Sequence, residues 1–268
     1  MIPKIIHICW FGGGEKSDTI LRCEESVRRV ATDYSIMYWD DSNCPKLPFV
    51  DECIRWKKWA LLSDYIRLHA LLQYGGIYLD TDVELIRPFE DLLSSECVIG
   101  FERPQLDAKC IGNAVLASSP GHSFIEECYR VFLCSMYTRS KPFYGVKVGN
   151  MVACRRGLRR YGTQILGDVQ ILARESFYPE PTSLHKDSYC IHHLEGSWHR
   201  KRGWIHDCNS IRYRTSRMLA IAHRFIQAPS QHRALRYACP KKWGHSEYVK
   251  QLIANKILDR TSGTAAQD

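Results

Sequence analysis

Short apolar runs alternate with longer amphipathic segments over the first part of the chain. The apolar runs end in glycines or in Asp and Asn, as buried strands do where they enter a loop. We predict strands at residues 5–11, 34–39, 77–79 and 97–101. The amphipathic segments repeat their apolar positions at helical spacing. We predict helices after the capping pair Ser17-Asp18, over residues 56–73 and near 123–133. Gly75 is the predicted left-handed end of the helix over residues 56–73. The alternation of strands and helices predicts an α/β fold with helices on both faces of a sheet.

The composition narrows the class of protein. With 268 residues, 45% apolar and 25% charged, the chain has the make-up of a soluble globular protein. No apolar stretch is long enough for a membrane helix, and the first residues lack the features of a signal peptide, so we expect a cytoplasmic protein. The twelve cysteines include no Cys-x-x-Cys pair, which favours reduced, mostly buried thiols over a disulfide framework or a zinc site.

Positive charge gathers near the C-terminus. Residues 200–260 hold fourteen Lys and Arg against three Asp and Glu, a net charge of +11, so the rest of the chain carries −3 of the total of +8. We therefore predict two parts, a catalytic domain at 1–204 and a basic helical extension at 205–268. Residues 211–227 form an amphipathic basic pattern suited to an anionic membrane surface or a partner protein.

The strongest chemical signal is Asp80-Thr81-Asp82, which directly follows an apolar strand. Ligands gather at the carboxyl ends of strands in α/β sheets, and two carboxylates so spaced can hold a divalent cation that in turn binds a diphosphate. Asp and Thr are also common in turns, so this motif alone is weak. Asp64 and Arg67 share one face of the preceding helix, where they can bind sugar hydroxyls and phosphate or form a surface ion pair.

Two stretches taken together resemble the core of the DxD-containing sugar transferases. They are Leu62-Ser63-Asp64-Tyr65-Ile66-Arg67 and Tyr74-Gly75-Gly76-Ile77-Tyr78-Leu79-Asp80-Thr81-Asp82. The opening residues 2–12 are similar to the first strand of that family, and residues 192–198 resemble its closing motif. The family includes bacterial capsule and lipopolysaccharide glycosyltransferases, fungal initiating mannosyltransferases and the large glucosylating toxins. The resemblance implies a GT-A-like nucleotide-sugar-binding sheet.

The resemblance also implies a role for each matching residue. Trp10 matches the aromatic residue that stacks on the nucleotide base. Ser63, Asp64 and Arg67 match donor-sugar and phosphate contacts, and Asp80 matches a contact to sugar and ribose. Asp64, Arg67 and Asp80 are then the expected catalytic residues.

A metal site is implied by Asp82 and the closing motif. His193 and Ser197 are the preferred further ligands, and Trp198 is expected to reach the diphosphate. An imidazole ligand suits Mn²⁺ better than Mg²⁺. The substitute ligands are His192 and Glu195.

These implications predict a metal-dependent retaining glycosyltransferase. The donor is a nucleotide diphosphate sugar, with a UDP-sugar favoured, and the acceptor is a surface polysaccharide or a lipid-linked oligosaccharide. The cofactor is Mn²⁺ or Mg²⁺. We expect the enzyme to work on an anionic membrane surface, at the cytoplasmic face of the inner membrane, without a nucleic acid partner. No residue stands out as a covalent nucleophile, which favours transfer on the face that the diphosphate leaves.

Two alternatives use the same features. Haloacid-dehalogenase-like phosphatases also end a strand in Asp-x-Asp, with the first residue, here Asp80, as the nucleophile. Their motif usually has Thr or Val where this chain has Glu84. The non-enzymatic alternative is a basic protein that binds nucleic acid or a membrane through its C-terminal part.

Overall fold

The computed structural model describes residues 1–107, 110–138, 145–180 and 184–196. Contacts divide the chain into two compact units, Met1–Phe132 with Phe143–Ile205, and Leu133–Pro142 with His206–Asp268. The fold described below is that of the first unit. The predicted basic extension at 205–268 lies outside the described residues, so the two-part division stays a prediction.

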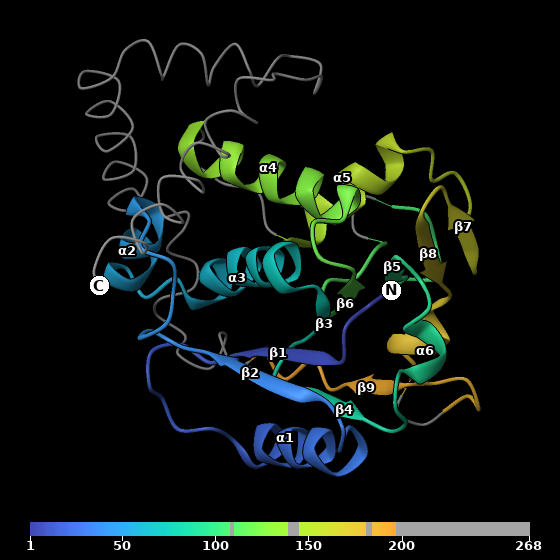
Figure 1. The fold of residues 1–268 in the computed structure, drawn as a ribbon, viewed down its shortest axis with the longest axis horizontal. Helices are drawn as coiled ribbons and strands as arrows, with labels where there is room; N and C mark the ends of the chain where they lie inside the picture. The colour runs from blue at the N-terminus through green and yellow to red at the C-terminus, as the bar shows by residue number, and fades with distance from the viewer. Residues whose placement is uncertain (108–109, 139–144, 181–183, 197–268) are drawn as a thin grey trace, which may run out of the picture. The chain divides into compact units, whose positions relative to one another are not determined.

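A seven-stranded mixed sheet forms the centre of this unit, in the order β2-β1-β3-β6-β5-β8-β7 (Figure 1). Strand β1 is parallel to β2 and β3, and β5 is parallel to β8, whereas the other neighbours are antiparallel. A separate antiparallel pair is formed by β4 and β9. The strands are β1 Ile5–Cys9, β2 Ser35–Trp39, β3 Gly76–Leu79, β4 Val83–Leu85, β5 Cys97–Gly100, β6 Val115–Ser118, β7 Gln164–Leu166, β8 Val169–Leu172 and β9 Cys190–His192.

Helices lie on both sides of this sheet, with α1 on one side and α3 on the other (Figure 1). The predicted α/β class with helices on both faces is therefore confirmed. The helices are α1 Asp18–Val30, α2 Pro48–Arg55, α3 Trp59–Tyr74, α4 Ser123–Thr138, α5 Gly145–Arg155 and α6 Arg174–Phe177, with a 3-10 turn at Glu90–Leu92.

The predicted cap at Ser17 is confirmed, whereas Gly75 is confirmed as the end of α3 but not in the left-handed helical conformation. Ser17 is the N-cap of α1, and its side chain accepts a hydrogen bond from the Ile20 amide at 3.4 Å. Gly75 ends α3 with a φ of 63°, although its ψ of −156° is not that of the left-handed helix. A Cβ at this position would lie 2.6 Å from Pro120 and 2.8 Å from the Ser118 carbonyl, so only glycine fits.

The two faces of β1 show why this strand is central. Ile6 and Ile8 point to one side, where they join a buried cluster with Val27 of α1. His7 points to the other side, where its Nε2 lies 2.8 Å from the Gly75 carbonyl oxygen and its Nδ1 accepts from the Trp39 indole at 3.3 Å. These bonds fit a neutral imidazole that carries its proton on Nε2. The side chains of β1 thus make contacts on both sides of the sheet.

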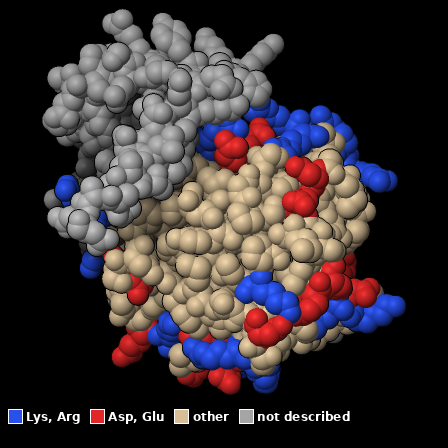
Figure 2. All heavy atoms as spheres, viewed as in Figure 1, with Lys and Arg blue, Asp and Glu red and all other residues tan. Residues whose placement is uncertain are grey.

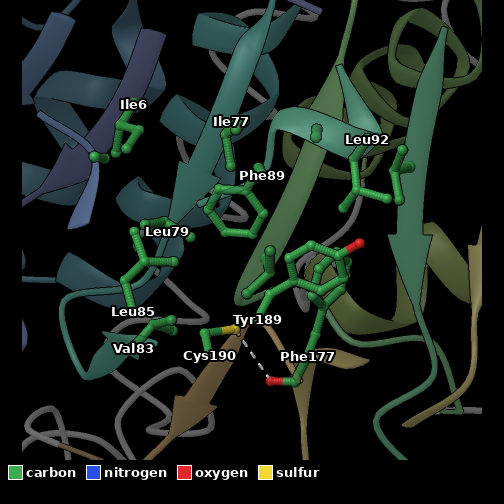
Figure 3. Close-up of a cluster of buried hydrophobic side chains, with 14 of the residues drawn as sticks. Ile6, Ile77, Leu79, Val83, Leu85, Phe89, Leu92, Phe177, Tyr189 and Cys190 are labelled. Carbon is green, nitrogen blue, oxygen red and sulfur yellow. Dashed lines mark hydrogen bonds between the residues drawn. The ribbon is translucent and has the colours of Figure 1, made fainter. Parts of the chain in front are cut away.

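The buried cluster also fixes the start of β9 (Figure 3). Figure 3 shows Phe89, Phe177 and Tyr189 packed beside Cys190, and the rings of Phe89 and Tyr189 stack at 5.6 Å. The Cys190 thiol donates to the Phe177 carbonyl oxygen at 3.4 Å. Because Tyr189 and Cys190 are 5% and 0% exposed, the strand that leads to the two histidines is firmly placed.

The described residues also show where charged side chains and cysteines lie. On the face drawn in Figure 2, the described Lys and Arg residues lie among Asp and Glu residues around an uncharged area. Nine cysteines of the described residues are free and seven of them are buried, which agrees with the expectation of reduced, mostly buried thiols for these nine. Within the described ranges, no helix has both the length and the apolar character to cross a bilayer.

Candidate active site

The candidate site lies where the parallel strands β1 and β3 end. Trp10 directly follows β1, and Asp80 to Asp82 directly follow β3. Val83 of β4 pairs with His192 of β9, so this short second sheet brings the closing motif beside the Asp-x-Asp motif. Carboxyl ends of parallel strands form the usual ligand-binding edge of an α/β sheet.

Three side chains meet at this edge in an arrangement that fits a cation. One ligand atom from each of Asp80, Asp82 and His192 lies within 4.8 Å of the other two. Asp82 Oδ1 and His192 Nε2 lie 3.4 Å apart, and all three residues are half-buried. Two carboxylates and one imidazole are a donor set for a divalent first-row metal. The residues present therefore fit the cation that the sequence predicts.

The histidine in this cluster is His192 and not His193, which we preferred from the sequence. His193 turns instead to Glu84, with 2.8 Å between Nε2 and Oε2. Neighbouring side chains of an extended segment point to opposite sides, so only one of the two can face Asp82. The sequence does not reveal which one, because the register of β9 on β4 decides it. Ser197 and Trp198, also predicted at this site, lie outside the described residues.

Neighbouring groups shift the pKa values of Asp82 and His192 in opposite directions. Burial alone would raise the pKa of Asp82, but the His192 ring and the Glu195 amide bring this pKa below its usual value. Burial alone would lower the pKa of His192, but Asp82, helped by Asp80 and Glu102, raises it. Burial raises the pKa of Glu102 itself. The site thus favours positive charge beside Asp82.

Asp64 lies deeper than its predicted role requires. The residue is 6% exposed, and each carboxylate oxygen has a protein donor. Oδ1 accepts from the Asn113 amide at 3.0 Å, and Oδ2 accepts from the Gly145 backbone N–H at 2.9 Å. Gly145 is the first residue of α5, so Asp64 binds the positive end of that helix. Burial raises the pKa of Asp64, with Arg67 opposing.

Arg67 joins the two predicted carboxylates, Asp64 and Asp80. Its Nη2 lies 3.3 Å from Asp64 Oδ1 and 3.2 Å from Asp80 Oδ1, and its side chain is only 6% exposed. The guanidinium also lies 4.5 Å from the centre of the Tyr78 ring and donates to the Asn113 carbonyl. Burial disfavours its charge, but these neighbours raise the pKa of Arg67 above its usual value. In this structure the Arg67 guanidinium therefore contacts other residues of the protein itself.

The remaining predicted residues are placed near the same edge. Ser63, half-buried, accepts from Arg67 Nε at 3.3 Å through its carbonyl oxygen. The Trp10 indole donates to the Gly14 carbonyl oxygen at 2.9 Å, and the Lys16 ammonium lies 5.8 Å from its ring centre. The hydrogen bond to Gly14 thus helps to fix the plane of the Trp10 ring at the end of β1.

Sequence reasoning missed two residues that shape the site. The Tyr78 hydroxyl donates to Asp80 Oδ1 at 2.7 Å, and its position two residues earlier on the same strand face is a signal that could have found it. A Cβ on Gly145 would lie 2.5 Å from Asp64 Oδ1 and 2.4 Å from Asn113 Nδ2. No local pattern identifies this glycine, because its contact is 81 residues away in the sequence.

Comparisons with known proteins agree with this geometry. Residues 17–99 match the family described as a glycosyltransferase sugar-binding region containing the DXD motif. The matched region includes α3, Arg67 and both aspartates of the Asp-x-Asp motif. It therefore favours sugar transfer over the phosphatase alternative.

Curated relatives come from fungi and a virus. Glucan organizing enzyme 1 of Cryptococcus neoformans var. grubii is 38% identical over 26% of this chain and 21% of its own length. An uncharacterized glycosyltransferase of Acanthamoeba polyphaga mimivirus is 26% identical over 71% of this chain and 77% of its own. Inositol phosphoceramide mannosyltransferase 3 of Schizosaccharomyces pombe is 30% identical over 48% and 36%. The chain thus spans about a fifth and about a third of the two fungal relatives.

Among solved structures, the PaToxG glycosyltransferase is 19% identical, with a TM-score of 0.47 over 58% of this chain and 70% of its own. The match over residues 17–99 shows that this part of the chain is similar to the sugar-binding region of glycosyltransferases that contain the DXD motif.

Proposed function

We propose that this protein transfers a sugar from a nucleotide diphosphate donor to an acceptor hydroxyl, with a divalent cation held by Asp80, Asp82 and His192. The observation that carries the proposal is the meeting of these three side chains within 4.8 Å at the carboxyl edge of the sheet. A cation bound there would supply positive charge to the diphosphate as the leaving group departs. The imidazole among the ligands favours Mn²⁺ over Mg²⁺.

The chain's own residues supply orientation. Arg67 pairs with both Asp64 and Asp80 and keeps the two carboxylates in fixed directions. Asp80 keeps a half-buried side chain at the edge, from which it can accept hydrogen bonds from sugar and ribose hydroxyls. Trp10 presents an aromatic ring at the end of β1 for the nucleotide base, and a UDP-sugar is the donor we favour. Trp198 and Ser197 complete this proposal as predicted donor and metal contacts.

We propose transfer with retention of the anomeric configuration. The carboxylates of Asp64, Asp80 and Asp82 are engaged by Arg67, Tyr78 or His192, so none of these three is set apart as a covalent nucleophile. The acceptor hydroxyl would then attack on the face that the diphosphate leaves. NMR of the anomeric proton in the first product measures this: inversion would contradict same-face transfer.

For the acceptor we propose a glycan on a lipid carrier at an anionic membrane surface. The net charge of +11 over residues 200–260 suits such a surface. The name of the fission-yeast relative, inositol phosphoceramide mannosyltransferase 3, also refers to a lipid. Bacterial surface polysaccharide is the acceptor class expected from the sequence. Sedimentation of the full chain with anionic and with neutral liposomes tests the surface: binding to neither would contradict it.

Donor binding is the direct test of the proposed reaction. A panel of UDP-sugars and GDP-sugars, each with Mn²⁺ and with EDTA, is measured by the shift in thermal midpoint of the full chain. We expect at least one UDP-sugar to stabilise the protein only with Mn²⁺, because ligands that bind the folded state alone raise its stability. No stabilisation by any nucleotide sugar would refute the proposal.

A further inference from the structure

The short segment at residues 193–195, which has a positive φ at its centre and is called the turn below, contacts Asp82. We propose that the hydrogen-bonded pair of Ser17 and Glu195 fixes this turn and so positions Asp82 for the cation. The inference rests on the cation site of the proposed function. It concerns positioning, since neither Ser17 nor the Glu195 carboxylate is proposed to touch the cation.

The turn contacts Asp82 from two directions. The Asp82 carbonyl oxygen accepts from the His193 amide at 3.0 Å, and Oδ2 accepts from the Glu195 amide at 2.9 Å. The second oxygen, Oδ1, is the one directed to His192, at 3.4 Å. The direction of the carboxylate therefore depends on where the Glu195 amide lies.

The backbone conformation at the centre of the turn is costly. Leu194, at its centre, has a φ of 51°, a conformation that a residue with a Cβ adopts only at a cost. The Leu194 side chain is 68% exposed, so burial contributes little to offset that cost. Contacts at the ends of the turn must keep it in place.

The contact at the far end is made to helix α1. The Ser17 hydroxyl lies 2.8 Å and 2.7 Å from the two carboxylate oxygens of Glu195, across 178 residues of sequence. Ser17 is itself fixed, because it is the N-cap of α1 and accepts from the Ile20 amide. A carboxylate at the N-terminus of a helix is also favoured by the helix dipole. The Glu195 side chain thus ties the turn to a rigid part of the fold.

Two nearly isosteric variants separate this contact from the helix cap. Asn and Asp are equally good N-caps, but Asn can donate an N–H to Glu195 whereas an ionised Asp can only accept and repels it. We expect Ser17→Asp to raise the dissociation constant for Mn²⁺ about ten-fold or more, as loss of a group that orients a metal ligand does. Ser17→Asn should stay within about three-fold of the wild type. Glu195→Ala, which leaves the cap intact, should weaken binding like Ser17→Asp.

The measurement is a titration of the full chain with Mn²⁺ alone, in which free Mn²⁺ is followed by electron paramagnetic resonance. Ser95→Ala is the matched control, because its hydroxyl makes a comparable 2.7 Å bond to Gln170 on another part of the sheet. Thermal midpoints without metal show that each variant is folded.

Three outcomes are distinguishable. Weaker Mn²⁺ binding in Ser17→Asp and Glu195→Ala, but not in Ser17→Asn or Ser95→Ala, supports the inference. Unchanged binding in Ser17→Asp and Glu195→Ala overturns it, and so does equal weakening in both Ser17 variants. Asp82→Asn tests the underlying site: if it binds Mn²⁺ like the wild type, the proposed cation site itself is wrong.

Discussion

Replacement of Arg67 by methionine removes the one positive charge shared by Asp64 and Asp80. Its Nη2 lies 3.3 Å and 3.2 Å from those carboxylates, and its side chain is 6% exposed. Loss of one partner from a buried ion pair leaves an uncompensated charge and costs about 3–5 kcal/mol of unfolding free energy. Methionine fills much of the space of the arginine stem, so the charge is the main change.

The pH dependence of this loss identifies its cause. Burial already raises the pKa of Asp64 above its usual value, and Arg67 opposes that rise. Without Arg67 the pKa of Asp64 should rise further. A carboxyl group whose pKa is higher in the folded than in the unfolded protein destabilises the fold at any pH above its unfolded pKa. Protonation at lower pH removes that cost. The difference between wild type and Arg67→Met should therefore be smaller at pH 5 than at pH 7.5.

Urea unfolding followed by circular dichroism at both pH values measures the two differences. Arg22→Met is the control, since Arg22 is 57% exposed and lies 3.6 Å from Glu84. Such a surface pair contributes about 0–1 kcal/mol. A loss below about 1 kcal/mol for Arg67→Met, or an equal loss at both pH values, would refute the reasoning from a buried charge.

Other predictions address single positions. In the Mn²⁺ titration described above, His192→Ala should weaken binding far more than His193→Ala. The reverse order would show that His193, the ligand preferred from the sequence, binds the cation. Burial lowers the pKa of His7 from 6.5, so the unfolded chain binds the extra proton and wild-type stability falls as pH drops below 6.5. His7→Gln should flatten that fall in urea unfolding between pH 7 and 5; an unchanged slope would contradict it. Gly145→Ala should cost about 1–3 kcal/mol, because its Cβ would lie 2.5 Å or less from two site side chains. Gly149→Ala, whose Cβ would contact another residue only at 4.0 Å, is the control and should leave the thermal midpoint unchanged or higher.

Local patterns predicted those parts of the fold that depend on local physics. The N-cap at Ser17 and the glycine end of α3 follow from capping chemistry, which acts within a few residues. The strand that ends in Asp80 follows from an uninterrupted apolar run. Each of these features could be predicted from a window of about a dozen residues.

The parts of the candidate site that escaped prediction depend on pairing across the chain. Strands β4 and β9 have three residues each, and they are strands only because residues near 84 meet residues near 191. Their register selects His192 over His193, and a shift of one residue would exchange the two. The close contact of Gly145 with Asp64 is likewise long-range. Candidate residues could be predicted, but not which of them meet.

The central claim is that Asp82 holds a cation on which sugar transfer depends. The most direct measurement is release of nucleotide diphosphate from the donor that Mn²⁺ stabilises best, with wild type and Asp82→Ala, each with Mn²⁺ and with EDTA. The account predicts release by the wild type only with Mn²⁺, and none by Asp82→Ala although its circular dichroism spectrum is unchanged. Undiminished release by Asp82→Ala, or release by the wild type in EDTA, would contradict it.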